Sequence, residues 1–375
     1  LITVKKANMF RQKIGLMMLM SFGLYQMTTA QTDTTSTDEE EDYSMYDNLD
    51  FVDEAAKRYA PAKIKGISPA KLITVGYDFQ GKYDITAAGY ETNEGRFAEQ
   101  TATVNSTQGL RVEANIPVIS KNSLIVQVGA RLWDINYDFE DPTSLTNPLL
   151  TTLHNNDLAS IGLNTTIFKP LNEKSFLLFQ VAADMNGDYN FDEFQNMKYT
   201  KYSIAGIWGK RPSDNKQWGV GLSRTYRGGD MNYLPVFLFN WTSTTSKWGT
   251  EILFPARGHV RYTVNPRSLL FFGYEAEGYS FRIGNQGQAR PDEDFDDLEI
   301  RRSEVRIRFV YERQIKGFLW LSAQAGYRYN YSFNVDQVPD GEDFYRGFFG
   351  DQEFIQENEL TNPLYFNVSI NLVSP

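Results

Sequence analysis

The chain has 375 residues, a formal net charge of −10, a mean hydropathy of −0.44 and no cysteine. These values exclude disulfide frameworks and thiolate metal sites, and no apolar run reaches the ~20 residues of a transmembrane helix. Aromatic residues nevertheless make up 14% of the chain. Many aromatic residues at low hydropathy are typical of strands that expose apolar residues to lipid on one face only.

The first segment has the pattern of a secretion signal. From Met9 onward, the basic residues Arg11 and Lys13 precede an apolar core at 14–24 and a small-residue cleavage site at 28–30. That core is too short to span a bilayer. We therefore expect residues 1–30 to comprise a signal peptide and the few residues upstream of it. The mature chain has no cysteine to carry a lipid anchor.

Residues 31–65 are expected to form an acidic, disordered periplasmic tail. Between Gln31 and Glu54 the sequence contains ten acidic residues and no basic one. Such a segment cannot bury enough apolar surface to order itself. The chain also lacks the basic patch that nucleic acids require, so we expect no nucleic-acid partner.

Residues 66–375 are predicted to form an all-β, antiparallel, up-and-down transmembrane barrel, because an alternation of period two recurs along them. In the first run the apolar face consists of Ile73, Val75, Tyr77 and Phe79. Similar runs occupy 103–116, 124–131, 161–167, 177–184, 304–312, 319–331 and 364–372. In the run 103–116, Val104 is assigned to the same face as Leu110. Several runs reach the ~9–11 residues that a tilted strand needs to cross a bilayer. Strands of soluble sheets average about five or six, so the barrel is favoured over a soluble β-sandwich.

Aromatic residues near the predicted strand ends are assigned to the interfacial girdles of such a barrel. The residues assigned in this way are Trp133, Tyr137, Phe139, Tyr226, Trp241, Trp248, Tyr329, Tyr331 and Phe333.

Connections between the runs alternate in length, which orients the barrel. Short turns are expected at 117–122, 169–174, 211–216, 243–246, 265–267 and 316–317, and long links at 84–99, 140–156, 186–197, 284–297 and 334–362. Short turns are periplasmic in this architecture, so both termini should be periplasmic and the strand number even. Parity then requires 248–264 to split near Pro255, which cannot donate to a ladder. We predict about 14 strands, with 12 as the alternative.

Neither histidine is placed for catalysis. His154 lies in a predicted outer loop, and His259 alternates with Val260 and so faces the lumen, near Glu251. A membrane phospholipase barrel needs a serine paired with a histidine on the lipid-facing side. We therefore predict a protein that is not an enzyme and has no cofactor.

The acidic loop 291–299 offers weak calcium ligands in Asp292, Asp294 and Asp296. Calcium takes six or more oxygen ligands, but this loop lacks the glycine-punctuated order of a dedicated calcium site. A solvated acidic loop is the default interpretation.

The most informative polar residues are charged side chains that are predicted to face the lumen from three consecutive strands and to form a cluster there. Its members are Glu275, Glu277, Arg302, Glu304, Arg306, Arg308 and Arg328. Adjacent strands lie about 4.8 Å apart, so opposite charges on them can pair. One interpretation is a salt-bridged ladder that stiffens the wall; the other is a basic constriction that selects anions. The neighbouring carboxylates favour the ladder. A further hypothesis is that the acidic tail, 31–54, reaches these arginines as a plug.

The sequence resembles the uncharacterised outer-membrane β-barrel proteins of Gram-negative bacteria that are known as domains of unknown function. The resemblance covers roughly 66–373 and rests on the segments Lys71–Phe79 and Leu253–Ala256, on Arg261-Tyr262 and on the closing strand. It contains no catalytic motif, so no site residue carries over. Barrels of this kind often finish on an aromatic residue, whereas this chain ends in Ser374-Pro375.

Together these features predict a non-enzymatic barrel in the cell outer membrane, in contact with its lipid. The long acidic and aromatic loops favour a structural, accessory or loop-displaying role, with envelope proteins as possible partners. A polar lumen also permits the alternative, a narrow channel for small polar or anionic solutes.

Overall fold

The computed structural model describes residues 60–92, 95–188, 200–226, 231–283, 298–337 and 354–374. All of them belong to one compact unit, Lys57–Pro375. Most of the predicted acidic tail, the calcium candidates Asp292, Asp294 and Asp296, and the aromatic part of the last long loop lie outside these ranges.

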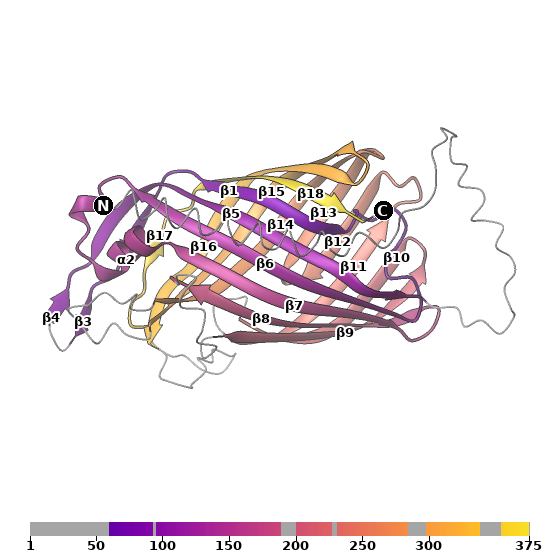
Figure 1. Cartoon of the computed structure of the whole chain (residues 1–375), viewed down its shortest axis with the longest axis horizontal. Helices are drawn as coiled ribbons and strands as arrows, with labels where there is room; N and C mark the ends of the chain where they lie inside the picture. The colour runs from indigo at the N-terminus through magenta and orange to yellow at the C-terminus, as the bar shows by residue number, and fades with distance from the viewer. Residues whose placement is uncertain are drawn as a thin grey trace, which may run out of the picture. The chain divides into compact units, whose positions relative to one another are not determined.

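The described residues form a closed antiparallel barrel of 14 strands, which confirms the predicted architecture and strand number (Figure 1). Its wall consists of β1 (Lys71–Gln80), β5 (Gln100–Lys121), β6 (Leu124–Phe139), β7 (Leu158–Pro170), β8 (Ser175–Gly187), β9 (Lys201–Ser213), β10 (Lys216–Thr225), β11 (Asn232–Thr242), β12 (Trp248–Phe254), β13 (Arg257–Asn265), β14 (Ser268–Ile283), β15 (Leu298–Lys316), β16 (Leu319–Gln337) and β18 (Leu364–Val373). The ring closes because β1 pairs with both β5 and β18.

The shorter elements gather at the end of the barrel that carries the long links (Figure 1). They are β2 (Tyr83–Ala87), β3 (Tyr90–Thr92), β4 (Gly95–Phe97), the 3-10 helix η2 (Pro142–Ser144), helix α2 (Pro148–Asn156) and β17 (Glu359–Leu360). The Asn147 side chain caps α2 by accepting a hydrogen bond from the Leu149 amide, as expected of an N-cap asparagine. Within the described ranges, no helix is long and apolar enough to cross a membrane.

The closing strand shows why the wall suits a bilayer. Its even-numbered apolar side chains, from Leu364 to Leu372, are 40–60% exposed. Its intervening residues face the lumen and are buried, ending with Asn371 at 0% exposure. Apolar side chains therefore point outward and polar ones inward, the pattern of a transmembrane barrel.

The predicted break at Pro255 is present. β12 ends at Phe254 and β13 begins at Arg257, so the chain turns where proline removes a ladder donor. The β12–β13 hairpin is shorter than the neighbouring strands. The last residue pair between β13 and β14 is Arg257 with Glu275, and β14 continues beyond this pair to Ile283. The far end of β14 instead meets β8, where the Asp188 amide donates to the Arg282 carbonyl over 3.1 Å.

At two β-bulges, one side chain points into the lumen although the sequence predicted that it would point outward. Around Asn105 the register between β5 and β6 shifts, and Val104 turns inward and is 0% exposed. Around Tyr331 the register between β15 and β16 shifts in the same way, and Phe333 turns inward. A bulge adds one residue to one strand, which exchanges the two faces of the strand beyond it.

Five of the nine aromatic residues assigned to the girdles are buried, so their assignment was wrong. These are Trp133, Tyr137, Phe139, Tyr226 and Phe333. On β6 the odd positions after Arg131 face the lumen, which places three of the rings inside the barrel. The other four are exposed, as a girdle requires: Trp241, Trp248, Tyr329 and Tyr331.

Buried apolar residues fill the lumen near the long-link end and form what we call the apolar cap. Helix α2 contributes Leu149, Leu150 and Leu153, each 0% exposed. The walls contribute Tyr83, Ile85, Ala87, Tyr90, Val104, Trp133, Ile135, Tyr137, Phe139, Leu158, Phe281, Ile283, Leu298, Ile300, Phe333 and Val335. The cap draws on β2, β3, β5, β6, β7 and β14–β16, so the two sides of the ring meet in it.

Residues 60–70 form a strap at the opposite, short-turn end. The Ala60 amide donates to the Asn172 carbonyl over 2.9 Å, and the Ser68 hydroxyl donates to the Glu251 carboxylate over 2.6 Å. The Arg211 guanidinium donates to the Lys63 carbonyl over 2.9 Å. Because these partners belong to β7–β9 and β12, far from β1 in the ring, the strap crosses the short-turn opening. Residues 60–65, assigned to the tail by sequence, are thus held on the barrel.

Candidate functional site

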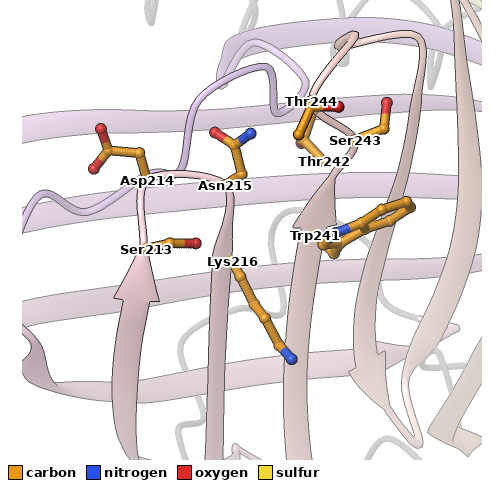
Figure 2. Close-up of a pocket in the computed structure, with 8 residues that line it drawn as sticks. All are labelled: Ser213, Asp214, Asn215, Lys216, Trp241, Thr242, Ser243 and Thr244. Atoms are coloured by element: carbon orange, nitrogen blue, oxygen red, sulfur yellow. The ribbon is translucent and has the colours of Figure 1, made fainter.

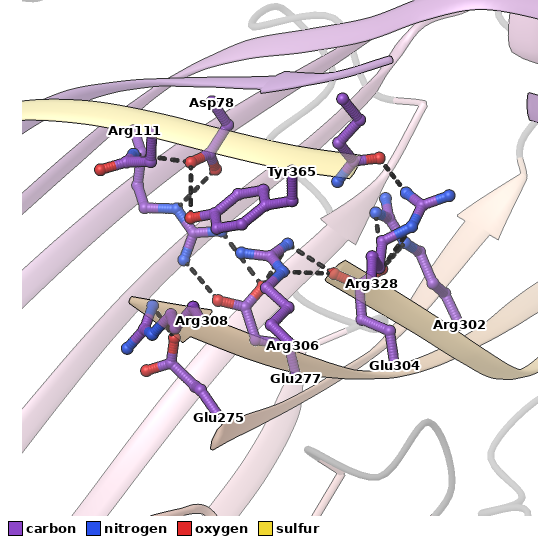
Figure 3. Close-up of polar contacts among 12 residues, drawn as sticks. Asp78, Arg111, Glu275, Glu277, Arg302, Glu304, Arg306, Arg308, Arg328 and Tyr365 are labelled. Carbon is purple, nitrogen blue, oxygen red and sulfur yellow. Dashed lines mark hydrogen bonds and ion pairs between the residues drawn. The ribbon is translucent and has the colours of Figure 1, made fainter. Parts of the chain in front are cut away.

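A layer of charged side chains crosses the lumen below the apolar cap, and we call it the ion-pair belt (Figure 3). It consists of Asp78 on β1, Arg111 on β5, Glu275 and Glu277 on β14, Arg302, Glu304, Arg306 and Arg308 on β15, and Arg328 on β16. The belt therefore contains all seven residues of the charge cluster proposed from the sequence.

The register of the strands alone does not show which residues of the belt form ion pairs with one another. On the ladder, Glu277 lies opposite Glu304, and Arg306 lies opposite both Glu275 and Arg328. The ion pairs instead run diagonally between β14 and β15: Arg308 reaches Glu275 at 2.6 Å and Arg306 reaches Glu277 at 2.9 Å. Long side chains can make such diagonal contacts in an antiparallel sheet.

Glu304 is the centre of the belt. Its carboxylate accepts hydrogen bonds from Arg302 at 2.9 Å and from Arg306 at 2.6 Å, and the Arg328 guanidinium lies 3.7 Å away. Glu304 is 1% exposed, and the three arginines are at most 2% exposed. A carboxylate can be buried here because charge-assisted hydrogen bonds replace its hydration.

Arg111 extends the belt across the lumen. Its guanidinium contacts Glu277 on β14 at 2.8 Å and Asp78 on β1 at 3.0 Å. Asp78 also accepts a hydrogen bond from Asn367 on β18 over 2.7 Å. Alternation along the sequence puts Asp78 and Arg111 on the faces opposite the apolar residues of their strands. Alternation does not show which strands face each other across the lumen, so these two residues were not predicted to belong to the charge cluster.

Aromatic rings cover the remaining surface of the guanidinium groups. Arg111 lies over Trp133 at 4.3 Å, Arg306 over Tyr365 at 4.6 Å and Arg328 over Tyr83 at 4.7 Å from the ring centres. Such cation–π contacts contribute more stabilising free energy when the interacting groups are removed from water. They join the belt to the apolar cap above it, because Trp133 and Tyr83 belong to the cap and contact arginines of the belt.

The belt carries five arginines and four carboxylates, so it has one excess positive charge (Figure 3). Arginine stays protonated in proteins, so the positive charges of the belt are fixed and its arginines are poorly suited to transferring protons. It can hold the wall strands together, and it can attract an anion.

The other candidates from the sequence are not members of the belt, although His259 interacts electrostatically with two of them, Arg308 and Glu275. His259 on β13 stands opposite Glu251 on β12, and its ring lies edge-on to Phe271 with 6.3 Å between centres. His154 belongs to the last turn of α2 and packs edge-on against Phe139. Among the described residues, no three acidic or histidine side chains form a group suited to a metal ion.

A pocket lies on the short-turn rim, away from the belt. Its volume is about 590 Å³, and it lies where the β9–β10 turn adjoins the β11–β12 turn (Figure 2). Its lining consists of Ser213, Asp214, Asn215, Lys216, Trp241, Thr242, Ser243 and Thr244. The pocket therefore combines hydroxyl and amide groups with one lysine, one carboxylate and one indole.

An outward apolar band, a closed 14-stranded ring and a lumen filled with paired charges define a transmembrane β-barrel of the outer-membrane type. Comparison with family models matches residues 77–372 to a domain of unknown function, DUF6268. The chain belongs to this family.

Three solved structures similar to the chain come from Pseudomonas species. An outer-membrane channel from Pseudomonas putida F1 is 14% identical, with 82% of this chain and 97% of that chain covered and a TM-score of 0.35. The toluene transporter TodX from Pseudomonas putida is 9% identical, with 82% and 90% covered and a TM-score of 0.31. A Pseudomonas aeruginosa FadL homologue is 9% identical, with 85% and 100% covered and a TM-score of 0.35. No curated protein matches the chain.

Proposed function

We propose that the protein is a non-enzymatic outer-membrane barrel that is closed along its axis and has a structural or accessory, loop-displaying role in the cell envelope. The observation that carries this proposal is the ion-pair belt buried beneath the apolar cap. The arginines around Glu304 are at most 2% exposed, so no column of water passes between their side chains.

An ion or solute moving along the axis would have to separate these charges. Breaking a buried ion pair costs about 3–5 kcal/mol, because the group left behind is uncompensated. The solute would also have to displace the apolar cap, whose α2 leucines are fully buried. Both layers favour a barrel whose function lies in its wall and its loops.

The same proposal gives the barrel a direction in the membrane. The Ser374 amide donates to the Ala70 carbonyl over 2.8 Å, so the chain enters the first wall strand and leaves the last one on the short-turn rim. Short turns face the periplasm in outer-membrane barrels. Secretion through the predicted signal peptide agrees with periplasmic termini.

Conductance of the purified protein in a planar bilayer tests the closed axis. We expect no stepwise current at moderate voltage, and steady ion-selective steps would refute the closed barrel. Envelope partners are tested separately, by isolating the protein from gently solubilised membranes. An accessory role predicts co-purifying envelope proteins in stoichiometric amounts.

A narrow channel for small polar or anionic solutes is the second candidate, favoured by the excess arginine in the belt. If the cap and the belt part during function, the five guanidinium groups would line the opening. This candidate predicts a reversal potential that favours chloride over potassium. It also predicts that Arg111→Gln lowers this preference, and an unchanged preference would rule out selection by the belt.

A further inference from the structure

Basic side chains surround the short-turn rim. Each described short turn has at least one exposed lysine or arginine on it or beside it: Lys121, Lys169, Lys174, Lys210, Lys216, Lys247, Arg267, Arg313 and Lys316. The exposed acidic residues of the same turns are Glu173 and Asp214. Asp214 is itself paired with Lys65 at 3.2 Å and with Arg211 at 3.4 Å. The rim therefore presents a positive surface.

The long-link rim has the opposite sign. Its described exposed acidic residues are Glu91, Glu99, Asp138, Glu140, Asp141, Glu357 and Glu359. The exposed Lys82 is paired with Glu140 at 2.9 Å. An anionic lipid headgroup is attracted by about 1 kcal/mol for each basic residue near the membrane surface. This attraction acts on the short-turn rim and not on the other one.

One part of the positive rim adds aromatic rings to its lysines, and we call it the tryptophan–lysine patch. It consists of the outward residues Trp208, Lys210, Lys216, Trp218, Phe239 and Trp241 of β9–β11. The Lys210 ammonium lies 5.3 Å from the Trp208 ring centre, and the Lys216 ammonium lies 5.6 Å from that of Phe239. Indole rings favour the headgroup level of a bilayer, so the lysines are held at the depth of lipid phosphates.

The rim pocket adjoins this patch and shares Lys216 and Trp241 with it (Figure 2). The pocket adds the hydroxyl groups of Ser213, Ser243 and Thr244, which can donate hydrogen bonds to phosphate oxygens. Nearer the middle of the wall, Val220 and Phe237 are 48% and 41% exposed. Polar donors at the rim and apolar side chains next to them match a molecule with an anionic head and acyl chains.

We propose that the tryptophan–lysine patch and the rim pocket bind an anionic glycerophospholipid of the periplasmic leaflet. Its phosphodiester lies between Lys210 and Lys216, its glycerol head contacts the hydroxyl groups of the pocket, and its acyl chains lie along Val220 and Phe237. The choice of leaflet rests on the orientation given in the proposed function, whereas the site itself is independent of conduction and stands whether the axis is closed or open.

Native mass spectrometry of the full-length protein in detergent tests this site, with phosphatidylglycerol and phosphatidylcholine as probes. We expect wild type to retain phosphatidylglycerol in preference to phosphatidylcholine. The double variant K210Q/K216Q should lose about 30-fold in affinity, because two lysines at roughly 1 kcal/mol each amount to about 2 kcal/mol. The control K121Q/K316Q removes the same charge from the same rim and should leave the affinity near that of wild type.

Equal losses in the two double variants would overturn the site in favour of diffuse attraction by the rim. Equal retention of both lipids by wild type would overturn the requirement for an anionic head. A second measurement uses wild type alone, so it does not depend on the folding of a variant. Phosphatidylglycerol with brominated acyl chains should quench the tryptophan fluorescence at a lower mole fraction than brominated phosphatidylcholine, and identical quenching curves would contradict the proposal.

Discussion

The variant Glu304→Gln tests whether the ion-pair belt stabilises the barrel. The substitution keeps the size of the side chain and removes the carboxylate that Arg302 and Arg306 contact at 2.9 and 2.6 Å. The excess charge of the belt then rises from one to two, in a region where Glu304 is 1% exposed. At about 4 Å and an effective dielectric constant near 20, each lost pair is worth roughly 4 kcal/mol before desolvation is subtracted.

Measured losses of one partner from a buried pair amount to about 3–5 kcal/mol. We therefore expect Glu304→Gln to lower the free energy of unfolding by that amount. The assay is equilibrium unfolding in denaturant of protein folded into lipid vesicles, followed by tryptophan fluorescence.

The matched control is Glu140→Gln, which breaks a pair with Lys82 of similar length, 2.9 Å, whose side chains are more than half exposed. An exposed pair contributes about 0–1 kcal/mol, so this variant should unfold near wild type. If the two variants lose the same free energy, or if Glu304→Gln loses less than about 1 kcal/mol, the belt does not stabilise the barrel as argued.

Three further predictions concern other layers of the molecule. Leu150→Ala in the apolar cap, where the side chain is 0% exposed, should cost about 2–5 kcal/mol in the same unfolding assay; a loss below about 1 kcal/mol would mean that the cap is loosely packed. Leu222→Arg on the lipid face, at 71% exposure, should cost about 2–4 kcal/mol if the residue lies in the hydrocarbon region, and no loss would place it outside that region. Arg211→Ala removes the donor to the Pro61 and Lys63 carbonyls, so amides of residues 60–68 should exchange hydrogen faster while those of β9 do not; unchanged exchange would show that other contacts suffice to hold the strap.

The wall of the barrel could be read from the sequence because a strand has a period of two. The exposed Leu364 and Phe366 and the buried Asn367 of β18 follow that rule. The break at Pro255 could also be inferred, since an even number of strands was needed to return the chain to the short-turn side.

The errors arose where the period is interrupted or was not applied. Asn105 and Tyr331 sit at bulges that reverse Val104 and Phe333, and neither residue type marks a bulge in a sequence. Trp133 was assigned by its place near a strand end, although counting on from Arg131 would have turned it inward.

The belt was predictable only in part. Members on β14–β16 are neighbours along the chain, so adjacency of strands grouped them. Asp78 and Arg111 join them across the lumen, and that meeting depends on how the ring closes and on how wide it is. Those quantities are set by strand tilt and stagger, which leave no local mark on the sequence.

The pairing of β1 with β18 has a consequence for the order in which the barrel can be completed. These are the first and last strands of the wall, and they pair from Lys71 with Val373 to Gln80 with Tyr365. Until the last strand arrives, β1 and β16 each present a row of unpaired backbone groups, which a hydrocarbon environment does not tolerate. The side chains of Thr74 and Asn371 bond across the same seam over 2.9 Å. A nascent barrel would therefore need the ten residues of β18 in place before all backbone groups of its wall could be hydrogen-bonded in lipid.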